Sequence, residues 1–248
     1  MMVMGSQIFA SEIFAPKKVI SIPFQMVGKL IMVKAEVEGK SGLIIVDTGA
    51  PQIILNSAHF EGLENSLTSS TTGVEGTVPK TEYLSLKSFK IKELQVKNQM
   101  ARVIDLSHLE RSKGMEILGL VGFSVFRKHQ LHFDFRNQQI VLIPLSRKGQ
   151  PLVFDEKFAF PTDSIGFKMT GHLPYVEGFI GDKKVKLGLD SGTEATVLLN
   201  RVLKNRVEHF TASNRVIVRG VSQNNGKQAH GLLNSLQLGL DFHDNLEI

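Results

Sequence analysis

Two copies of the tripeptide Asp-[Ser/Thr]-Gly stand in this sequence, and each supplies one carboxylate. The first copy begins at Asp47 and the second at Asp190. Two carboxylates held against each other can share one proton, because like charges about 3 Å apart cannot both ionise. Such a pair can take a proton from water with one group and donate a proton with the other. The two tripeptides therefore predict chemistry that uses an activated water molecule.

The residues around the two tripeptides repeat as well. Segment Phe24–Leu30 reads Phe-Gln-Met-Val-Gly-Lys-Leu, and segment Phe167–Leu173 reads Phe-Lys-Met-Thr-Gly-His-Leu. These segments lie 143 residues apart, as do the two aspartates. A single Asp-Ser-Gly or Asp-Thr-Gly could be an ordinary turn, because all of these residue types favour turns. The matched context instead predicts a duplicated half-domain with one carboxylate in each half.

Each tripeptide is preceded by an apolar run and followed by another, which is the pattern of a strand, a tight turn and a second strand. Alternating residues at 30–37 predict a half-buried strand, and the fully apolar Leu43–Val46 predicts a strand at the centre of its lobe. Between residues 107 and 114, Ser107 and Glu110 match a capping box, and Gly114 is expected to end that short helix.

The residues beside the two aspartates suit the task of joining two loops. The hydroxyl groups of Thr48 and Ser191 can donate hydrogen bonds that bridge the loops and hold the carboxylates coplanar. Gly49 and Gly192 permit close approach of the opposing backbone. We therefore expect these four residues to support the carboxylate pair.

A family resemblance rests on three segments. Leu43–Asn56 resembles the active-site strand and loop of pepsin-like and retropepsin-like aspartic proteases. Ile117–Gly122 resembles the later apolar-apolar-Gly segment that completes the loop around the aspartate in that family. Residues 123–143 resemble the family's short helix and closing hairpin. The likeness is greatest to bacterial two-lobed members, and it covers the chain from about residue 19 onward.

The resemblance implies an all-β, bilobal acid-protease fold, with two related β-barrel-like lobes, a cleft between them and a few short helices. It also implies an aspartic endopeptidase that hydrolyses polypeptide substrates, with Asp47 and Asp190 as the catalytic pair. A flap is expected to close over the substrate and exclude water. By the resemblance, this flap consists of Gly73, Val74, Glu75 and Gly76.

The repeat also predicts the domain organisation. We expect a tail at residues 1–18, a first lobe at 19–148 and a second lobe at 152–248. The second lobe is expected to be incomplete, because a counterpart of Ile117–Gly122 would lie beyond Ile248. Such a lobe would expose apolar edges and tend to self-associate.

Two other functions stay open at this point. A non-catalytic, peptide-binding pseudoprotease would keep the cleft without a working carboxylate pair, and the missing strands of the second lobe favour it. A homodimeric retropepsin-like protease would use only the first lobe and build its site from two copies of Asp47. In that case Asp190 would be dispensable.

Composition excludes several other classes of function. The chain has no cysteine, which excludes disulfides, thiol nucleophiles and Cys-ligated zinc. Its eight histidines show no zinc-binding spacing. We therefore expect no metal and no cofactor. A net charge of +5 comes from scattered Lys and Arg, and there is no Trp, so we expect no nucleic-acid partner. No segment has the length of a membrane span. The N-terminus lacks a basic n-region, which leaves the compartment open, a secreted or periplasmic location included.

Overall fold

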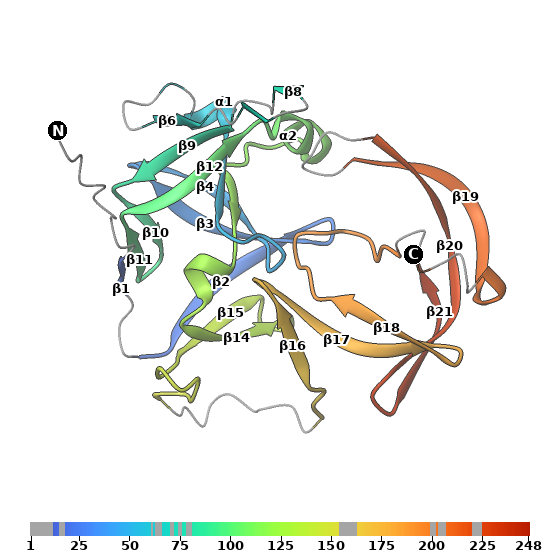
Figure 1. Cartoon of the computed structure of the whole chain (residues 1–248). Coiled ribbons are helices and arrows are strands. Elements are labelled where there is room, and N and C mark those ends of the chain that lie inside the picture. The colour runs from blue at the N-terminus through green and yellow to red at the C-terminus, as the bar shows by residue number, and fades with distance from the viewer. Residues whose placement is uncertain are drawn as a thin grey trace.

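The computed structural model describes residues 12–14, 18–60, 62, 66–69, 72–73, 76–77, 81–153, 163–198, 202, 207–219 and 225–248. Within these ranges the chain is mostly β-strand, as the sequence pattern predicted. The strands form two large, separate sheets and one two-stranded ladder, and Figure 1 shows the first large sheet on the left and the second on the right. Most of the predicted tail at residues 1–18 lies outside the described residues.

The first sheet holds thirteen of the described strands. They are β1 (Glu12–Phe14), β2 (Ile20–Val27), β3 (Leu30–Val37), β4 (Lys40–Val46), β5 (Ile53–Asn56), β6 (Ser66–Ser69), β9 (Thr81–Leu86), β10 (Phe89–Ile91), β11 (Leu94–Lys97), β12 (Gln99–Ile104), β13 (Gly119–Val121), β14 (His129–Asp134) and β15 (Gln139–Pro144). Three short α-helices accompany them: α1 (Ser57–Phe60), α2 (Ser107–Lys113) and α3 (Phe123–Phe126). No helix within the described ranges is long and apolar enough to cross a membrane.

Strand β4 lies inside this sheet with a partner on each edge. It pairs antiparallel with β3, and it pairs parallel with β13, where Gly119 is opposite Ile44 and Val121 is opposite Val46. Strand β13 in turn pairs with β5. Because β4 is covered on all sides, its last three residues are buried, which explains why Leu43–Val46 is apolar throughout. Strand β4 therefore delivers Asp47 from the interior of the sheet.

The alternation predicted for residues 30–37 is seen in β3. Its odd-numbered positions, from Ile31 to Val37, belong to the larger hydrophobic core cluster. On the other face, Leu30 and Met32 join a smaller cluster, whereas Lys34 is exposed. The polar positions thus occupy only the later part of one face, and the first half of the strand is buried on both sides.

The second sheet holds six of the described strands. They are β16 (Phe167–Thr170), β17 (Leu173–Ile180), β18 (Lys183–Gly188), β19 (Phe210–Arg219), β20 (Asn225–Leu238) and β21 (Asp241–Glu247), with a 3-10 helix η1 (Val207–His209) before β19. Strands β17 and β18 begin 143 residues after β3 and β4 begin. The sequence repeat is therefore also a repeat of strands, from β2–β3–β4 to β16–β17–β18.

The two halves differ at the strand that carries the aspartate. Among the described strands β18 pairs only with β17, whereas β4 pairs with both β3 and β13. As a result Leu189 is 45% exposed, while its counterpart Val46 is fully buried. A cavity of about 1000 Å³ opens at this place, and its lining includes Leu187, Leu189, Val197, Leu198, Leu236 and Leu246. The predicted exposure of apolar side chains on the second half is thus seen beside β18.

Helix α2 begins at Ser107, but the predicted capping box is wrong. The helix has no side-chain cap, and Ser107 Oγ donates a hydrogen bond to the carboxylate of Asp105 instead. The Glu110 carboxylate accepts the backbone N–H of Ile117 rather than reaching back to the helix start. A tertiary partner has therefore replaced a local one. Gly114 does end the helix in the left-handed conformation, as predicted.

Candidate active site

The loops that follow β4 and β18 meet, and they bring Asp47 and Asp190 together. The two carboxyl groups share a hydrogen bond. Each carboxylate also lies against the glycine of the opposing loop: a Cβ atom on Gly192 would be 2.3 Å from Asp47 Cγ, and one on Gly49 would be 2.6 Å from Asp190 Cγ. Side-chain carbons do not approach other atoms so closely, so only glycine fits at these two positions.

Four hydrogen bonds join the loop that contains Thr48 to the loop that contains Ser191. Thr48 Oγ1 donates to the carbonyl oxygen of Leu189 at 2.8 Å, and Ser191 Oγ donates to that of Val46 at 2.8 Å. In return, Thr48 Oγ1 accepts the N–H of Ser191 at 3.0 Å, and Ser191 Oγ accepts the N–H of Thr48 at 3.1 Å. Each hydroxyl thus donates once and accepts once across the junction. The position of one loop therefore sets the position of the other.

Backbone amides orient the two carboxylates. Asp47 Oδ1 accepts the N–H of Gly49 at 2.8 Å and that of Ala50 at 2.9 Å. Asp190 Oδ1 accepts the N–H of Gly192 at 2.8 Å. Because one oxygen of each group is held by its own loop, both carboxylates keep a defined direction toward the junction.

The Asp47 carboxyl holds its proton unusually strongly. Its pKa is raised from 3.8 to about 7 by burial, by the negative charge of Asp190 and by the hydrogen bond with Asp190. The amides of Gly49 and Ala50 act in the opposite direction and are outweighed. Asp47 therefore keeps its proton up to about pH 7, beside the carboxylate of Asp190.

We expect this shared proton to make stability depend on pH. The pKa of Asp47 is higher in the folded chain than in the unfolded chain, so its stabilising effect is complete below about pH 4 and is lost as pH rises through about 7. The loss should be on the order of 1–3 kcal/mol in the free energy of unfolding. Urea unfolding at pH 4 to 8 measures it, and the variant Asp47→Asn should remove it. A wild-type-minus-variant difference that is constant with pH would contradict the shared proton.

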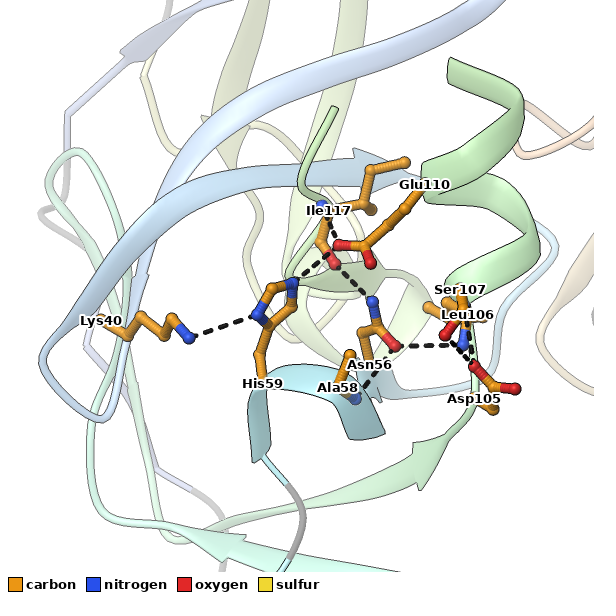
Figure 2. Close-up of polar contacts among 9 residues, drawn as sticks. All are labelled: Lys40, Asn56, Ala58, His59, Asp105, Leu106, Ser107, Glu110 and Ile117. Atoms are coloured by element: carbon orange, nitrogen blue, oxygen red, sulfur yellow. Dashed lines mark hydrogen bonds and ion pairs between the residues drawn. The ribbon is translucent and has the colours of Figure 1, made fainter. Parts of the chain in front are cut away.

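Behind the Asp47 loop, the buried Asn56 and the half-buried Glu110 hold Ile117 just before β13 (Figure 2). Glu110 Oε1 accepts the Ile117 N–H at 2.8 Å, and Asn56 Nδ2 donates to the Ile117 carbonyl oxygen at 3.2 Å. The same Glu110 oxygen lies 2.7 Å from His59 Nε2, and the fully buried Asn56 also accepts the N–H of Leu106 at 3.1 Å. Both backbone groups of Ile117 are therefore satisfied by side chains.

Strand β13 connects Ile117, which Glu110 and Asn56 hold in place, to the loop that carries Asp47. The carbonyl oxygen of Val121 accepts the N–H of Asp47 at 2.9 Å, and the N–H of Phe123 donates to the Ala50 carbonyl oxygen at 2.9 Å. Burial raises the pKa of Glu110, but the hydrogen bonds from Ile117 and His59 outweigh it, and the pKa is lowered overall. The charged Glu110 thus anchors the strand on which the Asp47 loop rests.

We expect Glu110→Ala to lower the free energy of unfolding by about 2 kcal/mol, because the buried Ile117 N–H would lose its acceptor. Glu116→Ala is the matched control, since Glu116 is exposed on the same segment and its loss should change stability by less than about 0.5 kcal/mol. Urea unfolding of both variants measures the difference. Equal midpoints for the two variants would show that the Glu110 contacts contribute nothing.

Comparison with known proteins identifies one part of the chain. Residues 33–125 match the family model described as aspartyl protease. This segment is an aspartyl protease domain. No curated protein matches the chain. A retropepsin-like aspartic protease from Rickettsia conorii is similar among solved structures, with 20% sequence identity and a TM-score of 0.35, over 54% of this chain and 91% of that chain.

Within the aspartyl protease domain, a short ladder marks the predicted flap. Strands β7 (Thr72–Gly73) and β8 (Gly76–Thr77) pair, with Gly73 opposite Gly76. Val74 and Glu75 lie outside the described residues. The pairing places the two ends of the predicted flap opposite each other, and its role as a flap stays a prediction.

Two residues outside this domain contact it, and the sequence analysis did not propose either of them as a site residue. His172 Nε2 lies 2.8 Å from the carbonyl oxygen of Gly49, and Glu194 contacts both Lys113 and Lys29. The repeat carried a signal for His172, which holds the position of Lys29 in the second copy. In the described part of the chain, no group of three or more His, Asp or Glu residues could hold a metal ion.

Proposed function

We propose that this chain is an aspartic endopeptidase in which Asp47 and Asp190 activate the water that attacks a peptide carbonyl. The observation that carries the proposal is the meeting of the two carboxylates, which share a hydrogen bond and raise the pKa of Asp47 to about 7. Of the two aspartates of the pair, the aspartyl protease domain at residues 33–125 contains only Asp47. The second carboxylate is supplied by the repeated loop outside that domain, at Asp190.

The pair would work with one proton. Asp47, whose pKa is raised, holds the proton, and Asp190 acts as the base. Asp190 takes a proton from water as the water oxygen attacks the carbonyl carbon, while Asp47 gives its proton to the carbonyl oxygen. The C–N bond then breaks as the leaving nitrogen gains the proton that Asp190 took from water, and one hydroxyl of the tetrahedral diol returns its proton to Asp47. One proton is left on the two carboxylates at the end, as at the start.

We further propose that the two sheets are the two lobes of a bilobal acid-protease fold, at residues 19–148 and 152–248. The equal offset of β3 from β17 and of β4 from β18 supports this, and so do the reciprocal hydroxyl bonds between the loops. In this arrangement the β7–β8 hairpin, with Gly73, Val74, Glu75 and Gly76, would be the flap over a bound polypeptide. The exposed apolar side chains beside β18 would favour self-association.

One observation favours the peptide-binding alternative. The outer edge of β18 has no partner among the described strands, and an extended peptide can add to such an edge through backbone hydrogen bonds. A chain of this kind would bind unfolded polypeptides whether or not the carboxylate pair works.

Cleavage of an unfolded protein, followed from pH 3 to pH 8, tests the proposal. Wild type should cleave and Asp47→Asn should not. Equal cleavage by both chains would overturn the carboxylate mechanism. Absence of cleavage by both, with an extended peptide still bound, would establish the peptide-binding alternative instead.

A further inference from the structure

Glu194 lies in the loop that carries Asp190, but its carboxylate contacts the other half of the chain. Oε2 accepts a hydrogen bond from Lys113 Nζ at 2.5 Å, and Oε1 accepts the backbone N–H of Lys29 at 3.1 Å. Lys113 is the last residue of α2, and Lys29 lies in the turn between β2 and β3. The Lys113 side chain is only 11% exposed, and that of Glu194 is 39% exposed. A single carboxylate therefore joins the Asp190 loop to two elements of the first sheet's half.

The Glu194 carboxylate packs tightly against the turn between β2 and β3. A Cβ atom on Gly28 would lie 2.1 Å from Glu194 Oε1, and Gly28 also has a φ of +62°. Burial raises the pKa of Glu194, but the hydrogen bonds from Lys113 and from the Lys29 amide outweigh burial and lower it. The lowered pKa favours the charged form of Glu194, which is the form that binds the Lys113 ammonium.

A second contact crosses the junction in the opposite direction. His172 lies in the turn between β16 and β17, at the position that Lys29 occupies in the first copy of the repeat. Its Nε2 atom is 2.8 Å from the carbonyl oxygen of Gly49, in the loop that carries Asp47. A carbonyl oxygen can only accept, so Nε2 donates. Each aspartate loop is thus contacted by the turn of the opposite half.

Only the second copy of the repeat has a carboxylate at the position of Glu194. The corresponding residue in the first copy is Pro51, which has no carboxylate to offer. In addition, Lys113 and Glu110 stand on the same helix, and Glu110 anchors the strand behind the Asp47 loop. Helix α2 is therefore connected to both aspartate loops, to one through Glu110 and β13 and to the other through Lys113 and Glu194.

We infer that Glu194 is a positioning residue that, together with Lys113, holds the Asp190 loop at the distance from Asp47 that the carboxylate pair requires. The inference rests on the proposed function. It differs from an ordinary surface ion pair, of which Lys90 and Glu36 are an example at 3.0 Å with both side chains about 40% exposed. Exposed pairs of that kind have little effect, because both ions are well solvated when apart. Lys113 is largely buried, and Glu194 binds backbone as well.

A double-mutant cycle on the full chain tests this inference. The variants are Glu194→Ala, Lys113→Met and their combination, with Glu36→Ala as the control for loss of an exposed pair. We expect Glu194→Ala to lower kcat by about 10- to 100-fold with KM changed by less than about threefold, because a small displacement of a reacting group costs rate rather than binding. The double variant should be no slower than the slower single variant. Glu194→Gln, which keeps an acceptor oxygen, should recover part of the rate.

The outcomes separate the inference from the proposed function. If wild type cleaves, Asp47→Asn does not, and Glu194→Ala keeps full kcat, the positioning role is overturned and the protease proposal stands. If wild type cleaves nothing, the protease proposal fails, and a second measurement decides the inference. That measurement is the NMR titration of the Asp47 carboxyl carbon, which faces the Asp190 carboxyl and the amides of Gly49 and Ala50. Its midpoint should fall from about 7 toward 3.8 in Glu194→Ala, and an unchanged midpoint would overturn the inference.

Discussion

Replacing Asp190 by asparagine should lower kcat for peptide hydrolysis by at least about 1000-fold, as much as replacing Asp47. The pair needs one charge and one proton, and an amide can neither ionise nor return a proton. Removing Asp190 also removes two of the causes of the raised pKa of Asp47, namely the negative charge of Asp190 and its hydrogen bond, and leaves burial, which is the largest cause. The double variant should therefore be no slower than either single variant. Steady-state kinetics on one peptide substrate measure all three.

This experiment also separates the two-lobed site from the homodimeric alternative. A homodimer that uses two copies of Asp47 would be inactivated by Asp47→Asn and unaffected by Asp190→Asn. Asp182→Asn is the matched control, because Asp182 is exposed in the turn between β17 and β18. Full activity of both Asp190→Asn and Asp182→Asn would exclude Asp190 from the site.

Gly192→Ala should lower kcat by about 100-fold and the free energy of unfolding by about 1–3 kcal/mol. The new methyl carbon would lie 2.3 Å from Asp47 Cγ and 2.5 Å from Asp47 Oδ2, so one of the two loops must move. Movement would separate the carboxylates and break the hydroxyl bonds between Thr48 and Ser191. Kinetics and urea unfolding of the same preparation measure the two effects.

Gly166→Ala is the control for this substitution. A Cβ atom at Gly166 would meet no atom within 4 Å, so this change should leave both the rate and the stability close to wild type. If Gly192→Ala is as active as Gly166→Ala, the two loops do not approach each other as closely in solution as the geometry requires.

Much of the fold followed from local patterns in the sequence. Period-two alternation indicated β3, a fully apolar run indicated the interior strand β4, and the 143-residue offset indicated that β17 and β18 repeat them. Gly114 marked the end of α2 correctly. Each of these features can be read from residue type and spacing within a short segment or from the likeness between two such segments.

The capping box at Ser107 shows where local patterns fail. Ser107 and Glu110 have the right spacing, but the Glu110 carboxylate binds the Ile117 N–H and lies beside His59, which is 51 residues earlier in the chain. A buried backbone amide without another acceptor outweighs a local cap, since leaving it unpaired costs more than the cap contributes. Only the tertiary contacts of Glu110 with Ile117 and His59 reveal that competition.

Residue types and spacing predicted two matched loops, each with a carboxylate, a hydroxyl and a glycine. This was possible because both copies of the repeat can be recognised in the sequence. The folded chain was needed to show that these loops meet, that Asp47 holds a proton up to about pH 7, and that Glu194 and His172 bridge the junction. The reason is physical. Burial, charge repulsion and hydrogen bonding depend on distances between segments more than 100 residues apart, and no local pattern specifies those distances.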